Sequence, residues 1–184
     1  MNYGLAGKRA LVTGAADGCG KAIALMLAQE GVQVVLHDLS MKEDALKANA
    51  ELCGNGATYL TADLSKEAEV EALFTQAGSL DILVNNAGIW PTAYVSEMTT
   101  AAFNKTMDIN LIAPFILCRN FVNQCKAEGK KGKIVNMTSQ AAFHGSTSGH
   151  AHYAASKAGL VTFTISLARK SPLWASTSTV LHLV

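Results

Sequence analysis

The sequence is poor in proline and in charge, and it has no long apolar run. Of its 184 residues, 3 are proline and 16 % are charged, whereas 49 % are hydrophobic. This composition excludes collagen-like, disordered and coiled-coil chains, because proline is too scarce, apolar content is too high and no heptad run occurs. No stretch approaches the roughly 18 apolar residues of a membrane span. Since domains average about 150 residues, we expect one domain over residues 1–184.

The sequence also lacks an excess of either charge. Its 15 basic and 14 acidic residues give a formal net charge of +1. A basic field is the electrostatic footprint of nucleic-acid binding, so no nucleic-acid partner is expected. Residues 1–9 lack the apolar core of a signal peptide, and we therefore expect a cytoplasmic protein without a membrane anchor.

Cysteine pairs with ligand-like spacing are absent too. The four cysteines are Cys19, Cys53, Cys118 and Cys125. No two of them form a C-x-x-C pair, and no histidine flanks them at metal-ligand spacing, so neither a zinc site nor a redox motif is indicated. We expect reduced thiols and no bound metal.

What the sequence does contain is an alternation of short β-rich runs and helical periodicity. Strands are expected over residues 9–13, 32–37, 58–60, 82–84 and 133–137, and helices over residues 21–29, 42–52, 66–76, 99–126 and 152–169. This alternation predicts the α/β class with a doubly wound parallel sheet, the three-layer α/β/α Rossmann fold. Pro114 predicts a break near Ala113 in the longest helical stretch.

A glycine-rich turn joins the first expected strand to the first expected helix. Residues 14–20 read G-A-A-D-G-C-G. Such a turn lets the backbone approach a pyrophosphate, which then faces the N–H groups and the positive dipole end of the helix. The spacing is neither G-x-G-x-x-G nor that of a P-loop, so the strand before the turn and the helix after it carry the prediction of nucleotide binding.

Asp38 ends the second expected strand, 24 positions after Gly14. A carboxylate about 20 residues beyond such a loop accepts the hydroxyls of the adenine ribose, and it repels a 2′-phosphate. No Arg or Lys stands at positions 15, 16, 17 or 39 to offset that charge, so NAD is favoured over NADP. Alternatively, Asp38 caps the helix that begins near Ser40.

Tyr153 and Lys157 stand four residues apart in the last expected helix. They therefore share one face, about 5–6 Å apart at Cβ. A free tyrosine, with a pKa of about 10, is a poor base at neutral pH, and a neighbouring ammonium lowers that pKa by favouring the phenolate. Ser139 follows an expected strand and so faces the ligand crevice at the carboxyl end of the sheet. A Y-x-x-x-K spacing alone is also common as a plain surface pair.

Together these features resemble the short-chain dehydrogenase/reductase family over about residues 5–169. The motifs that carry the resemblance are T-G-x-x-x-G-x-G at residues 13–20, N-N-A-G at residues 85–88, Asp63-Leu64, Asn110, and the set Ser139, Tyr153 and Lys157. The resemblance implies an NAD-dependent oxidoreductase that transfers a hydride between a nicotinamide cofactor and a small secondary alcohol or ketone. The cofactor-binding residues that it implies are Gly14, Asp17, Gly18, Cys19, Gly20, Asp38, Asp63, Leu64, Asn86, Ala87, Gly88, Tyr153 and Lys157.

The same resemblance implies a role for each catalytic residue. Tyr153 is the general acid/base, and Lys157 holds the nicotinamide ribose and lowers the pKa of the tyrosine. Ser139 orients the substrate oxygen, and Asn110 supports a water that links Lys157 to solvent. Cys19 replaces the isoleucine usual at its position. We expect little effect of that change, since the backbone N–H makes the contact.

Histidines and aromatic residues near these motifs leave alternatives open. His144, His150 and His152 either line the substrate pocket or bind a metal, although no carboxylate or cysteine completes a metal set. Trp90 and Tyr94 either border the substrate pocket or cover the edge of the sheet.

The resemblance stops after Arg169. The family would continue with a sixth strand, a Pro-Gly pair, a substrate-covering segment and a seventh strand, whereas residues 170–184 read K-S-P-L-W-A-S-T-S-T-V-L-H-L-V. One back-translation of this tail, read one base earlier, gives the family-like E-I-A-P-L-G-I-H-V-N-C-V-A-P-G. We therefore hypothesise a one-base deletion near codon 170.

This divergent tail has consequences for fold and function. Residues 180–184 can still form a sixth strand, whereas the usual last strand is expected to be lacking. The homo-oligomer usual in the family is doubtful for such a chain. A dinucleotide-binding protein without turnover, its substrate region missing, is therefore the alternative to an active oxidoreductase.

Overall fold

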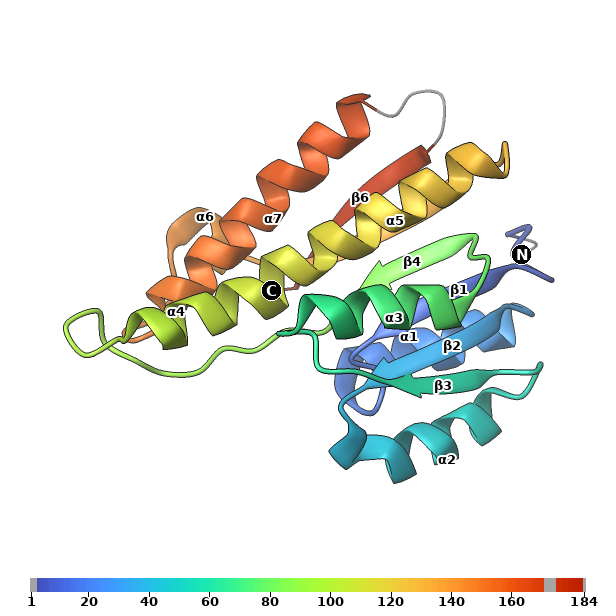
Figure 1. Ribbon diagram of the computed structural model, residues 1–184, viewed down its shortest axis with the longest axis horizontal. Coiled ribbons are helices and arrows are strands. Elements are labelled where there is room, and N and C mark those ends of the chain that lie inside the picture. Colours follow the sequence, from blue (N-terminus) through green and yellow to red (C-terminus); the bar gives the residue numbers. More distant parts are fainter. Residues whose placement is uncertain (1–2, 171–174, 184) are drawn as a thin grey trace.

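A computed structural model of the chain describes residues 3–170 and 175–183. Its sheet has the order β3-β2-β1-β4-β5-β6, and every neighbouring pair of strands is parallel (Figure 1). The strands are β1 Arg9–Thr13, β2 Gln33–Asp38, β3 Thr58–Thr61, β4 Ile82–Asn85, β5 Gly132–Ser139 and β6 Ala175–Leu183. The order reverses between β1 and β4, and ligands of doubly wound sheets bind at this switch point, beyond the carboxyl ends of the strands.

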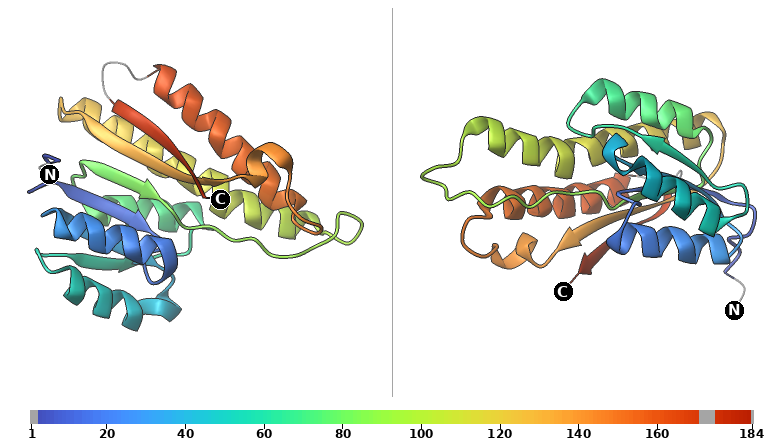
Figure 2. Two further views of the ribbon diagram at one scale, coloured as in Figure 1. Left: turned by 180° about the vertical axis from the view of Figure 1, so that it is seen from behind. Right: turned by 90° about the horizontal axis from the view of Figure 1, so that it is seen from below.

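Helices cover both faces of the sheet (Figure 2). They are α1 Gly18–Gln29, α2 Glu43–Cys53, α3 Glu67–Ala77, α4 Thr100–Met107, α5 Ala113–Ala127, α6 Ala141–His144 and α7 Ala151–Lys170, with a 3-10 turn at Ser40–Lys42. One buried cluster packs α1 and α2 against β1, β2 and β4, and a second packs α3, α5 and α7 against the other face. The doubly wound, three-layer α/β/α fold expected from the sequence is therefore confirmed. Within the described ranges, no helix is long and apolar enough to cross a membrane.

The sixth strand is longer than the sequence predicts. Ala175–Leu183 pairs with β5, whereas the expectation placed a β-run only at residues 180–184. Residues 171–174 and 184 lie outside the described part of the chain. The backbone of the divergent tail therefore extends the sheet at its β5 edge.

The predicted break near Pro114 takes the form of a π-helical turn. α4 passes into a π-turn at Asp108–Ile112, and α5 then begins at Ala113 with Pro114 in its first turn. Because proline has no N–H, it cannot give the carbonyl of Asn110 the hydrogen bond that an α-helix would supply. Such single π-turns are frequent at functional sites. This one places Asn110 inside the molecule.

Buried polar contacts fasten α7 to the sheet. The Asn136 side chain of β5 donates a 2.8 Å hydrogen bond to the Thr164 hydroxyl. Next to it, the Asn85 side-chain amide of β4 donates to the side-chain oxygen (Oδ1) of Asn136 at 2.8 Å. Since buried polar groups are costly when unpaired, these bonds favour one position of α7 along the sheet.

Candidate active site

The glycine-rich turn packs too closely for a side chain at two of its positions, Gly14 and Gly20. A Cβ on Gly20 would lie 2.0 Å from the carbonyl oxygen of Gly14, a distance that no real contact allows. Gly14 has a φ of +67°, and its Cβ would lie 2.9 Å from the Cα of Ala87. The turn therefore needs glycine at both positions, and its backbone lies against the N-N-A-G turn that follows β4.

Two side chains tie these turns together. The Asn86 amide donates to the carbonyl oxygens of Thr13 at 2.9 Å and Gly14 at 3.0 Å. In return, the buried Thr13 hydroxyl accepts the backbone N–H groups of Asn86 at 3.0 Å and Ala87 at 3.1 Å. The threonine that opens the first motif and the second asparagine of N-N-A-G thus hold β1 and β4 at the switch point.

The N-terminus of α1 carries no side-chain cap. Asp17 occupies the N-cap position, but its carboxylate makes no hydrogen bond to the first turn of the helix. It pairs instead with the Lys42 ammonium at 2.6 Å. The backbone at Gly18, Cys19 and Gly20 therefore begins a helix whose positive dipole end is free of a side-chain cap, as an anion site requires.

Asp38 lies at the carboxyl end of β2, beside this turn. Its two carboxylate oxygens accept the backbone N–H groups of Ala16 at 3.2 Å and Leu39 at 2.9 Å. Both bonds leave acceptor capacity on the carboxylate. The carboxylate is therefore fixed at the place where the sequence expects the adenine ribose.

Lys42 is the residue near the adenosine end that the sequence reasoning missed. The sequence offers no basic residue at positions 15, 16, 17 or 39, whereas the turn at Ser40–Lys42 brings the Lys42 ammonium back to Asp17. The hydrogen bond to Asp17 raises the pKa of Lys42, and the negative charge of Asp38 contributes. A cation therefore lies near the place where the prediction of NAD assumed none.

Asp63 and Leu64 follow β3. The Asp63 carboxylate accepts the hydroxyl of Ser65 at 2.7 Å and its backbone N–H at 3.0 Å. These two bonds lower the pKa of Asp63. Leu64 is buried in the core cluster beneath α3. Asp63 is thus anionic and held in its own turn, and Leu64 packs behind it.

Tyr153 and Lys157 share one face of α7, as their spacing predicts. The Lys157 ammonium lies 5.9 Å from the centroid of the Tyr153 ring. It is buried and donates a 2.7 Å hydrogen bond to the carbonyl oxygen of Met137 in β5. Removal from water lowers the pKa of Lys157 to about 8. The amine is therefore still largely protonated at neutral pH.

Asn110 lies behind this pair, fully buried. Its side chain exchanges two 2.9 Å hydrogen bonds with the backbone of Ile89, one to the carbonyl and one from the N–H. It also donates to the Ser156 hydroxyl at 3.1 Å, and that hydroxyl donates to the carbonyl oxygen of Tyr153 at 2.7 Å. The Asn110 side chain is thus hydrogen-bonded to protein groups. Its backbone carbonyl lacks the usual α-helical hydrogen bond, because Pro114 has no N–H to donate.

Two further predicted residues complete the candidate site. Ser139 is half-buried at the end of β5, where its hydroxyl oxygen accepts the Ala141 N–H at 3.2 Å and leaves its own hydrogen able to donate. A Cβ on Gly88 would lie 3.3 Å from the Asn110 side-chain oxygen and 3.5 Å from the Lys157 ammonium. Gly88 therefore provides the clearance between the N-N-A-G turn and the Lys157 ammonium.

The three histidines have different environments. His144 is exposed, and His150 bonds to the loop after β4. His152 is fully buried, so the expectation that it lines a substrate pocket is wrong: it points from α7 into the protein. Of the two aromatic residues, Trp90 is 68 % and Tyr94 53 % exposed, so neither packs into the core.

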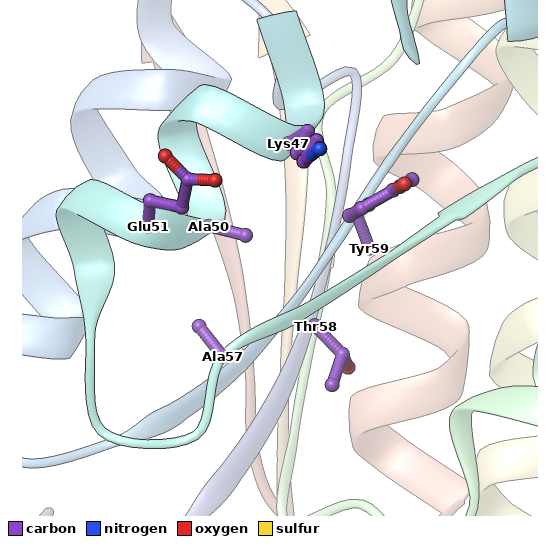
Figure 3. Close-up of a pocket in the computed structure, with 6 residues that line it drawn as sticks. All are labelled: Lys47, Ala50, Glu51, Ala57, Thr58 and Tyr59. Carbon is purple, nitrogen blue, oxygen red and sulfur yellow. The ribbon is translucent and has the colours of Figure 1, made fainter. Parts of the chain in front are cut away.

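A separate hollow lies between α2 and β3. It is lined by Lys47, Ala50, Glu51, Ala57, Thr58 and Tyr59 (Figure 3). β3 is the edge strand on the side of the sheet opposite to β5, which bears Ser139 and Met137. The hollow therefore takes no part in the candidate catalytic site.

Comparison with known proteins identifies the family. Residues 8–174 match the short chain dehydrogenase family, and the chain belongs to it. It is therefore a member of a family of oxidoreductases with a nucleotide-binding Rossmann fold.

The curated relatives are longer than this chain. An uncharacterized oxidoreductase of Thermotoga maritima is 41 % identical over 173 residues, covering 91 % of this chain and 66 % of the relative. A 3-oxoacyl-[acyl-carrier-protein] reductase of Rickettsia felis is 37 % identical over 163 residues, covering 89 % of this chain and 66 % of the relative. A hydroxyacyl-CoA dehydrogenase of Mycobacterium tuberculosis is 36 % identical over 181 residues, covering 90 % of this chain and 57 % of the relative. The chain thus spans less than two thirds of the length of these relatives.

Solved structures agree with the fold. A dehydrogenase/reductase from Sinorhizobium meliloti has a TM-score of 0.86 at 34 % identity, covering 96 % of this chain and 71 % of that one. A blue fluorescent protein from a metagenomic library, in complex with NADPH, has a TM-score of 0.83 at 32 % identity, covering 92 % and 70 %. At least one structural neighbour therefore binds a nicotinamide dinucleotide.

Proposed function

We propose that this protein is an NAD-dependent oxidoreductase that interconverts a secondary alcohol and a ketone, with Tyr153 as general acid/base. The observation that carries the proposal is the buried Lys157 ammonium, which faces the Tyr153 ring from 5.9 Å and adjoins the turn at Gly88. No structural reason requires a buried cation at this place, since its burial is costly. A functional reason does, because a nearby ammonium stabilises a phenolate.

The cradle at the switch point fits a dinucleotide. The turn has no room for a side chain at Gly14 or at Gly20, and the dipole end of α1 carries no side-chain cap. We assign the pyrophosphate contact to the backbone of Gly18, Cys19 and Gly20, and the adenine-ribose contact to Asp38. Asp63 and Leu64 would border the adenine, and Asn86, Ala87 and Gly88 the nicotinamide end, with Asp17 at the rim of the phosphate site.

The bound nicotinamide would supply hydride exchange with the carbinol carbon of the substrate, and the chain would supply the proton. In reduction, the Tyr153 hydroxyl donates its proton to the carbonyl oxygen; in oxidation, the phenolate accepts the alcohol proton. Lys157 stays charged near neutral pH and stabilises the phenolate, and its position also suits the ribose hydroxyls of the nicotinamide. Ser139 donates its free hydroxyl hydrogen to the same substrate oxygen.

Asn110 acts in this scheme through its place in the π-turn. Its side chain holds Ile89 and Ser156, and Pro114 cannot donate to its backbone carbonyl, so we assign that carbonyl to a water near Lys157. A water there would pass protons between Lys157 and solvent. This assignment agrees with the role that the family resemblance implies.

NADP is the second candidate cofactor, and Lys42 is the observation that favours it. The Lys42 ammonium lies 2.6 Å from Asp17 and could turn toward a 2′-phosphate. Asp38 opposes such a phosphate, and we therefore keep NAD as the proposed cofactor. The variant Lys42→Ala separates the two, with exposed Lys47→Ala as control: loss of affinity for NADPH but not NADH would identify Lys42 as the phosphate partner.

The function is tested by cofactor binding and turnover measured on the same preparation. Titration of NADH and NADPH fluorescence gives binding, and reduction of acetoacetyl-CoA gives turnover with a 3-oxoacyl thioester. One relative is named as a 3-oxoacyl reductase and another as a hydroxyacyl-CoA dehydrogenase. Binding with turnover supports the proposal. Binding without turnover of any ketone supports the alternative of a dinucleotide-binding protein. Absence of both binding and turnover contradicts the oxidoreductase and the dinucleotide-binding protein alike.

The reading-frame hypothesis for residues 170–184 is tested separately. Sequencing the locus decides it, since the alternative frame in the DNA either encodes the family-like continuation or does not. We also propose that residues 1–184 form one Rossmann domain.

A further inference from the structure

The loop that follows the N-N-A-G turn is tied to the catalytic helix at two points. This loop, residues 89–93, comes four residues after β4 ends and runs beside the segment that leads into α7 (Figure 2). The first tie is the Asn110 side chain, which holds both backbone groups of Ile89 and also the Ser156 hydroxyl of α7. Ser156 stands three residues after Tyr153. The first tie therefore secures the start of the loop on the C-terminal side of the proposed base.

The second tie lies on the other side of the base, at His150. The Nδ1 of His150 lies 3.1 Å from the carbonyl oxygen of Pro91, and its Nε2 lies 3.5 Å from the Thr92 hydroxyl. Beside the imidazole, the backbone N–H of Ala93 donates to the carbonyl oxygen of Gly149 at 2.8 Å. Three contacts from consecutive loop residues thus converge on two residues just before α7.

The chemistry of the partners fixes the tautomer of His150. A carbonyl oxygen only accepts, so Nδ1 carries the hydrogen that Pro91 receives. The neutral ring then accepts the Thr92 hydroxyl at Nε2. A protonated ring would donate at both nitrogens and keep both contacts, so the tie does not depend on the charge of His150.

His150 also belongs to the start of the catalytic helix. Its carbonyl oxygen accepts the backbone N–H of Ala154 at 3.0 Å, so the residue immediately precedes the first turn of α7. Gly149 has a φ of +86°, and a Cβ there would lie 2.8 Å from the Thr92 methyl group. The chain before His150 therefore fits closely against the loop, and only glycine allows the approach.

We propose that His150 is a positioning residue that joins the loop at residues 89–93 to the first turn of α7, so that the two move as one unit. Resting on the proposed function, the consequence is that Tyr153, three residues after His150, is held at a constant distance from the turn at Gly88. The exposed Trp90 lies within the loop so held, two residues after Gly88. Loss of the tie should therefore affect the carbonyl substrate more than the cofactor.

The test compares three variants at one position. His150→Ala removes both side-chain contacts, His150→Asn keeps a donor near Nδ1 for Pro91, and His150→Gln places its amide near Nε2 for Thr92. His144→Ala, an exposed histidine of the same segment, is the matched control. Because the Pro91 contact is the shorter one, His150→Asn should behave more like the wild type than His150→Gln.

The first readout does not need activity. Hydrogen–deuterium exchange of the Ala93 amide, which Gly149 protects, should speed up about threefold to tenfold in His150→Ala, the size of one solvent-exposed hydrogen bond. His150→Asn should restore most of the protection, and His144→Ala should leave it unchanged. Equal exchange in wild type and His150→Ala would contradict the tie, as would equal exchange in the Asn and Ala variants.

The second readout compares the change in kcat/KM with the change in the Kd for NADH. With acetoacetyl-CoA, His150→Ala should lower kcat/KM about tenfold while the Kd for NADH stays within about twofold. Unchanged kcat/KM alongside faster exchange would overturn the positioning role. If the wild type reduces no ketone, the proposed function fails, but the exchange measurement still decides whether His150 joins the two segments.

Discussion

The Lys157 ammonium donates a 2.7 Å hydrogen bond to the carbonyl oxygen of Met137, and it does so from the protein interior. This bond joins α7 to β5 just before the strand ends at Ser139. One neutral carbonyl does not replace the hydration of an ammonium, and the pKa of Lys157 accordingly falls to about 8. Lys157, which would lower the pKa of the proposed base Tyr153, therefore reduces the stability of the cofactor-free protein.

Replacement of Lys157 by methionine should stabilise the cofactor-free protein while abolishing turnover. The gain in unfolding free energy near neutral pH should be about 1–3 kcal/mol, because methionine fills a similar volume without burying a charge. Since the folded-state pKa of Lys157 lies below the unfolded one, wild-type stability should rise with pH above about 8, and the difference should shrink there. Urea unfolding of Lys157→Met at pH 7 and pH 9.5 measures this.

The exposed Lys47→Met serves as the control for that substitution and should change stability little. A Lys157→Met protein less stable than the wild type at pH 7 would show that the buried ammonium stabilises the fold.

Tyr153→Phe should reduce turnover at least about 100-fold, since general acid–base groups contribute two to four orders of magnitude. The ring remains, so the fold and the fluorescence titration with NADH should change little. Tyr94→Phe is the matched control, because Tyr94 is an exposed tyrosine of the loop beside the site. Turnover by Tyr153→Phe close to the wild-type rate would rule out Tyr153 as the base.

Thiol labelling gives a test of cofactor binding that needs no substrate. Cys19 is exposed in the first turn of α1, whereas Cys53, Cys118 and Cys125 are buried. Burial raises the pKa of Cys118 to about 12 and also raises the pKa of Cys53 and of Cys125. Iodoacetamide should therefore label the native protein mainly at Cys19, and saturating NADH should slow that labelling about tenfold or more.

The glycine beside this cysteine supplies the control. In Gly20→Ala, the new Cβ meets the Gly14 carbonyl oxygen, so the turn must open and NADH should no longer protect Cys19. Labelling of wild-type Cys19 at the same rate with and without NADH or NADPH would argue against a pyrophosphate contact at this turn.

Acid should destabilise the protein through two buried histidines. Burial lowers the pKa of His37 and of His152, and neither ring nitrogen of His152 has a hydrogen-bond partner among the described residues. Their folded-state pKa values lie below the unfolded one of about 6.5, so the unfolded chain binds protons first as the pH falls. Unfolding free energy should drop below about pH 6.5, by up to about 1.4 kcal/mol per pH unit for each histidine.

Urea unfolding between pH 7 and pH 5 measures this slope. His152→Gln should flatten it by up to one proton, whereas the exposed His144→Gln should not change it. An unchanged slope in His152→Gln would mean that this imidazole is already protonated, or already hydrated, in the folded protein.

Local sequence patterns predicted most of the site because local spacing determines its parts. Tyr153 and Lys157 share a face since four residues make about one helical turn, and Ser139 follows a strand whose carboxyl end must face the crevice. Gly14 and Gly20 are predictable for a similar reason, because their turn links a strand directly to a helix. Contacts between segments were not predictable in this way. Lys42 reaches Asp17 across 25 positions and His150 reaches Pro91 across 59, and neither pair forms a motif.

The sequence by itself determined the fold class, the nucleotide-binding turn and the residues of the proposed catalytic set, because each depends on short-range periodicity or on a steric need for glycine. The tertiary structure alone decided how these parts meet. It showed that the Lys157 ammonium is buried against Met137, that Pro114 turns the preceding helix into a π-turn at Asn110, and that His152 points inward. Burial and long-range hydrogen bonding arise only when the helices pack on the sheet, and pKa values and side-chain partners follow from that packing.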